Sequence, residues 1–295
     1  MGYGFLLLAL LAGATKGYCG KRTSGYVNEY KDAMLANSIR MIFCILIGLG
    51  MVLFSGGAGL LKIDGTTLWI TLLSGVGNSA FVVLWLIAVK KGAYMMLDIF
   101  CTIGILIPLI GCAVLFGEAI MPHHIVGMLI LLAAVFIMCS YNNSIKSKIT
   151  LSSLVLLLLC GAANGLSDFS QKLFVNLAAD TPISIYNFYT YLFSAVILFA
   201  CFFFFSKDSD EKTNIKKIFP YILVMSVCLF LYSYFKTLAA KYLSSAELYP
   251  LAQGGALVVS SIMSAVFFHE KITLKCVVGI VLTFAALIVI NVLQF

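Results

Sequence analysis

Five ionisable side chains lie within strongly apolar stretches, where they could take part in binding, proton transfer or structural pairing. These residues are Lys16, Arg40, Asp98, Asp168 and Lys172. A charge at the centre of a bilayer costs on the order of 3 kcal/mol, so each of them should face a partner or a wet cavity. We interpret Asp98 and Asp168 as candidate substrate or proton sites. If Lys16 faces the same cavity, it favours anionic or zwitterionic solutes over cations.

The same charges also allow structural interpretations. Asp168 and Lys172 are spaced i, i+4 and could neutralise each other on one helix. Asp98 could instead be a buried partner of Arg40 or Lys16. The expected role of Arg40 is structural, holding a carboxylate or capping carbonyls of a neighbouring helix.

Polar residues also follow helical faces within several apolar stretches. Ser74, Asn78, Phe81 and Trp85 are spaced i, i+4, i+7 and i+11, which is one helical face. Such stripes can be hydrogen-bonded helix contacts, but their recurrence in both halves favours a cavity. The predicted substrate-binding residues are Lys16, Asn78, Trp85, Asp98, Asn164, Asp168, Tyr189, Ser233 and Gln253.

The composition identifies a membrane protein. Hydrophobic residues make up 62% of the 295 residues and charged residues 11%, whereas soluble domains carry about 25% charged residues. The net charge of +7 is spread over short loops, so nucleic acid is not an expected partner. No phosphate-cradling loop is present, and His123 and His124 lack a supporting ligand cluster. We therefore expect no cofactor and no metal site.

The apolar stretches predict an all-α protein with ten transmembrane helices. Each stretch is close to the length of about 20 residues that crosses a bilayer. The predicted helices span residues 2–23, 33–54, 67–89, 93–116, 123–141, 151–177, 183–205, 217–240, 244–268 and 274–293.

An internal repeat organises these helices. Residues 113–134 and 265–286 share the pattern A-V-x-F-x-E-x-I, V-G and A-A at an offset of 152 residues. We predict two five-helix repeats, residues 1–146 and 147–295. Because each holds an odd number of spans, the second should be inverted relative to the first, as in many transporters.

The repeated motif resembles the drug/metabolite transporter superfamily, and the EamA-type branch fits best. Further likeness comes from Gly13-Ala14 and Gly17, echoed at Gly161-Ala162 and Gly165, and from Arg40. The sequence departs from the family in having Thr15-Lys16 where members often carry a tryptophan. The resemblance implies a central cavity lined by spans one to four and six to nine, with spans five and ten outside it.

Glu118 and Glu270 end the fourth and ninth predicted spans. A carboxylate at a helix C-terminus opposes the helix dipole, so each should cap a neighbouring helix N-terminus or bind a lysine. We interpret both as structural charges.

Together these features predict a multi-pass secondary transporter of the cell membrane. It would move a small polar or amphipathic metabolite, an amino-acid-like or other zwitterion or anion, by alternating access, and it would not be an enzyme. A membrane-embedded enzyme of lipid metabolism, or a channel or sensor, is the alternative. Proton coupling, import or export, and the choice between monomer and homodimer stay open. Loop charges favour both termini outside the cytoplasm.

Overall fold

The structure, a computed structural model, describes residues 1–27, 30–90, 100–139, 151–205, 215–268 and 274–291. These residues form helices and no strand. The elements are α1 (Gly2–Ser24), α2 (Tyr30–Gly56), η1 (Ala58–Leu61), α3 (Gly65–Lys90), α5 (Leu106–Phe116), α6 (Pro122–Cys139), α7 (Leu151–Leu177), α8 (Ile183–Phe205), α9 (Ile215–Ala240), α10 (Ser245–Phe268) and α11 (Leu274–Asn291).

The helices agree closely with the predicted segments. The largest difference at a described end is three residues, because α2 begins at Tyr30 rather than at residue 33. Within the described residues, five helical segments are long and apolar enough to cross a membrane, and they belong to α2, α3, α7, α8 and α9. This is the composition of an all-helical membrane protein.

The fourth predicted span, residues 93–116, contains an interruption. Residues 100–104 are helical, residue 105 is a turn, and α5 begins at Leu106. Pro108 explains the break, because its ring clashes with the carbonyl four residues earlier, that of Gly104. The α5 helix ends at Gly117, whose φ of 65° is the left-handed conformation that favours glycine.

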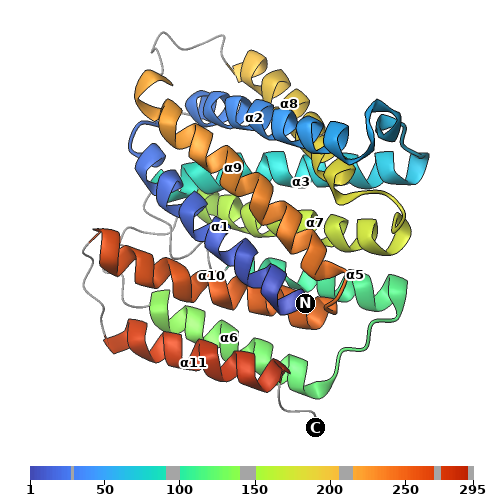
Figure 1. Cartoon of the computed structure of the whole chain (residues 1–295). Helices are drawn as coiled ribbons and strands as arrows, with labels where there is room; N and C mark the ends of the chain where they lie inside the picture. Colours follow the sequence, from blue (N-terminus) through green and yellow to red (C-terminus); the bar gives the residue numbers. More distant parts are fainter. Residues whose placement is uncertain (28–29, 91–99, 140–150, 206–214, 269–273, 292–295) are drawn as a thin grey trace.

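Helices from the two halves of the chain pack in pairs (Figure 1). Helix α1 packs along α9, α3 along α7, and α2 along α8. At one edge of the molecule α6 packs along α11. The fold is thus built from contacts between the halves, which creates an interface that side chains from both can line.

Candidate functional site

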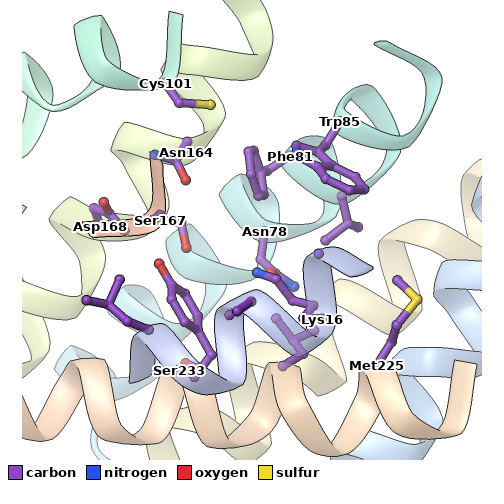
Figure 2. Close-up of a pocket in the computed structure, with 18 of the residues that line it drawn as sticks. Lys16, Asn78, Phe81, Trp85, Cys101, Asn164, Ser167, Asp168, Met225 and Ser233 are labelled. Atoms are coloured by element: carbon purple, nitrogen blue, oxygen red, sulfur yellow. The ribbon is translucent and has the colours of Figure 1, made fainter. Parts of the chain in front are cut away.

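A cavity of about 190 Å³ lies between the halves. Its described lining comes from α1, α2, α3, residue 101, α7, α8, α9 and α10, with no contribution from α6 or α11. These are the spans that the family resemblance implies. Figure 2 shows side chains from α1, α3, α7 and α9 around this space.

The cavity brings together most of the residues predicted to bind substrate. Those that line it are Lys16, Asn78, Trp85, Asn164, Asp168, Ser233 and Gln253. Asp98 lies outside the described residues. The stripe on α3 contributes Asn78 and Trp85 to this agreement, and all four of its residues line the cavity.

Tyr189 was predicted to bind substrate, but it is not among the residues that line the cavity. Its hydroxyl donates a hydrogen bond to the Leu61 carbonyl at 2.6 Å, between α8 and η1. Tyr186 and Thr190, spaced i, i+4 on α8, face the cavity instead. The i, i+4 spacing of their polar groups could have identified Tyr186 and Thr190 from the sequence. No such spacing pointed to Tyr232 on α9, which also lines the cavity.

Hydrogen bonds between helices account for part of the polar lining. Tyr186 Oη is 2.8 Å from Ser74 Oγ and 3.1 Å from Ser170 Oγ, which joins α8 to α3 and α7. Asn78 Nδ2 donates to Ser194 Oγ at 3.0 Å. These contacts hold the walls of the cavity and leave other polar groups for a solute.

Asp168 on α7 forms an ion pair with Lys236 on α9. Lys236 Nζ is 2.6 Å from Asp168 Oδ1, and the two residues are only 3% and 6% exposed. Tyr249 Oη donates to the Asp168 carbonyl at 2.6 Å. The buried pair therefore joins α7, α9 and α10. The alternative pairing of Asp168 with Lys172 is not formed.

Lys172 instead contacts Glu118, which lies just after α5. Lys172 Nζ is 3.1 Å from Glu118 Oε1 and donates to the Leu243 carbonyl at 2.7 Å. The Ser245 N–H donates to Glu118 Oε2 at 2.7 Å. Glu118 thus contacts both a lysine and the first residue of α10, which are the two structural roles considered for it. Glu270 lies outside the described residues.

The electrostatic surroundings of Glu118 favour its ionised form. Burial raises the pKa of this carboxyl, but the hydrogen bond from the Ser245 N–H and the positive charge of Lys172 lower it. The net pKa lies below the ordinary glutamate value. Ionised Glu118 therefore stabilises the junction between α5, α7 and α10.

Arg40, which was predicted to be a structural charge, lines the cavity. Its Nη1 donates to Asn37 Oδ1 at 3.1 Å, one turn earlier on the same helix. Its Nε is buried without a hydrogen-bond partner. The hydrogen bond that Arg40 makes in the described part of the chain is thus local to α2.

The fold and the cavity define an all-helical membrane protein with polar side chains gathered between its two halves. Residues 151–292 match the EamA-like transporter family. The match assigns this part of the chain to the drug/metabolite transporter superfamily, as the repeated motif also indicates, and the protein is membrane transporter-like.

Other comparisons bear on the fold alone. A solved crystal structure of a protein is similar to this chain with a TM-score of 0.75 and 15% sequence identity, covering 98% of this chain and 96% of that one. No curated protein matches the chain.

Proposed function

We propose that the protein is a secondary carrier that moves a small polar metabolite across the cytoplasmic membrane by alternating access. The observation that carries this proposal is the cavity of about 190 Å³ between the halves, lined by polar residues from both. Sites for drug-sized ligands are usually about 300–1,000 Å³. This cavity suits a smaller solute, of roughly the size of an amino or hydroxy acid.

The packing pattern supports two related five-helix repeats, residues 1–146 and 147–295. In order along the chain, α1, α2, α3 and α6 of the first unit correspond to α7, α8, α9 and α11 of the second. The contact of α1 with α9 is therefore equivalent to the contact of α7 with α3. The pairs α2 with α8 and α6 with α11 each join a helix to its own equivalent in the other unit. A two-fold relation between the units produces this pattern. With five spans in each unit, that relation inverts one unit relative to the other in the membrane.

Two equivalent helix contacts differ in a way that favours alternating access. Between residues 100–104 and α7, a Cβ added at Gly104 or Gly165 would collide with the facing backbone, so this contact is closed. The equivalent positions of the other repeat are Ala256 and Gly17. Both line the cavity, and a Cβ at Gly17 would meet nothing within 4 Å. One repeat contact is closed while its counterpart is open, as expected for a carrier opened on one side.

Counterflow in proteoliposomes tests this proposal. Vesicles loaded with an unlabelled solute are diluted into the labelled solute, over a panel of amino acids, hydroxy acids and sugar phosphates. A carrier gives saturable, transient accumulation of label for at least one solute. Equilibration without accumulation would indicate a channel, and the absence of flux for every solute with correctly folded protein would contradict the transport proposal.

A further inference from the structure

The described lining of the cavity holds more positively than negatively charged side chains. In the described part of the chain, its lining includes the cations Lys16, Lys21 and Arg40 and one carboxylate, Asp168. That carboxylate is bound by Lys236 at 2.6 Å. It is therefore already neutralised by a protein cation and is poorly placed to receive an ammonium group from a solute.

Lys16 reaches the cavity wall without a carboxylate contact among the described residues. Its Nζ lies 4.4 Å from the centre of the Tyr232 ring. An aromatic face attracts a cation but does not neutralise its charge. Arg40 and Lys236 lie within electrostatic reach of Lys16, and each repels it more strongly than Asp168 attracts it. A solute anion beside Lys16 would relieve this repulsion.

Arg40 adds a second cation with unused donors. The residue is 5% exposed, its Nη1 bonds only to Asn37, and its Nε has no partner. A buried guanidinium is costly unless its charge and its N–H groups are matched. Its planar donors suit a carboxylate or a phosphate group.

The other buried atoms of the described cavity lining that have no hydrogen-bond partner belong to neutral side chains. Gln171 Oε1 and Thr190 Oγ1 are buried, lack hydrogen-bond partners, and belong to residues that line the cavity. They can bond a hydroxyl group, because Gln171 accepts a hydrogen bond and Thr190 can donate or accept one. The cavity thus offers Lys16 and Arg40 together with neutral hydrogen-bonding groups.

We propose that Lys16 and Arg40 form an anion subsite and that the solute is a small hydroxylated organic anion rather than a zwitterion. This inference rests on the proposed transport function and narrows its substrate class. It assigns Arg40 a direct binding role in place of the expected structural one. The shared chemistry of the ligand is a carboxylate or phosphate group.

Matched solutes provide the test. L-lactate and L-alanine, and L-malate and L-aspartate, differ in having a hydroxyl or an ammonium group at one carbon, and glycerol 3-phosphate supplies the phosphate case. Trp85 lines the cavity and can report binding by fluorescence, with the second tryptophan removed by Trp69→Phe. We expect at least one hydroxy acid, or glycerol 3-phosphate, to bind the purified protein at least tenfold more tightly than the amino acids.

The variants locate the binding site. Lys16→Gln and Arg40→Gln should each weaken anion binding at least tenfold, and Lys16→Arg should largely retain it. Lys62→Gln is the matched control, because Lys62 is exposed and lies outside the cavity. Binding by glycerol 3-phosphate alone assigns a phosphate site, and binding by hydroxy acids assigns a carboxylate site.

Three results would overturn the anion subsite: amino acids binding as tightly as their hydroxy counterparts, binding unchanged by both glutamine variants, or no binding by any of these anions. Counterflow with the same solutes separates this inference from the transport proposal. Exchange of amino acids in preference to anions keeps the carrier and removes the anion subsite. Anion binding without exchange of any solute supports the anion subsite and contradicts the carrier.

Discussion

At the scale of single residues, the buried Lys236–Asp168 pair makes the strongest prediction about stability. Asp168→Asn leaves Lys236 buried without its counter-charge, and breaking a buried pair in this way costs about 3–5 kcal/mol. The double variant Asp168→Asn with Lys236→Met removes both charges and should recover much of that loss. Thermal unfolding of the purified variants measures both effects. Equal stability of Asp168→Asn and the parent would show that the pair contributes little.

The pairing of Asp168 also shows what the sequence could not specify. The i, i+4 rule identifies Lys172 as a neighbour on the same helix, but the partner in the structure is Lys236, 68 residues away. Local spacing places Asp168 on a cavity-facing side of α7 correctly. Which cation reaches it depends on the packing of α7 against α9, which no local pattern contains.

Glu118 predicts a dependence of stability on pH. Its pKa in the folded protein lies below the ordinary value, so its contribution is complete above the unfolded-state pKa. That contribution is lost as the pH falls through the folded-state pKa. Glu118→Gln should therefore lower stability at neutral pH and reduce the loss on acidification. Thermal unfolding of both proteins between neutral and acidic pH measures this difference, and parallel pH curves would contradict it.

At the scale of elements, the closed contact between residues 100–104 and α7 depends on glycine. A methyl group at Gly104 would collide with the Gly161 carbonyl, and overpacking of this kind typically costs about 1–3 kcal/mol. We expect Gly104→Ala to destabilise the described conformation. Gly17→Ala is the control, since a Cβ there meets nothing within 4 Å and alanine favours helix. If Gly17→Ala unfolds at a lower temperature than Gly104→Ala, this account is contradicted.

The helices themselves were largely predictable, because apolar length sets their bounds in a membrane protein. The predicted span 93–116 did not include the break at residue 105, although it contains Pro108, whose ring disrupts helical geometry. Tyr189 was assigned to the wrong face of α8, since its aromatic neighbours give no clear polar stripe. In contrast, the regular spacing on α3 placed Asn78 and Trp85 at the cavity.

At the scale of the whole molecule, the account depends on two related units that share one cavity. The sequence repeat predicted this organisation, and the cross-paired helices support it. The membrane orientation is predicted from the sequence alone, because the proposed two-fold relation would make the two faces of the fold similar. Loop charges, which favour both termini outside the cytoplasm, remain the basis for that prediction.

Access to the cavity from both faces of the membrane tests the central claim most directly. Ser233→Cys, placed in a protein from which the nine native cysteines have been removed, puts one thiol on the cavity wall. Membrane-impermeant thiol reagents are then applied to each face of oriented vesicles separately. We predict labelling from either face, slowed by a bound solute, because the proposed carrier would open the cavity to each side in turn. Labelling from one face only, with and without solute, would contradict alternating access.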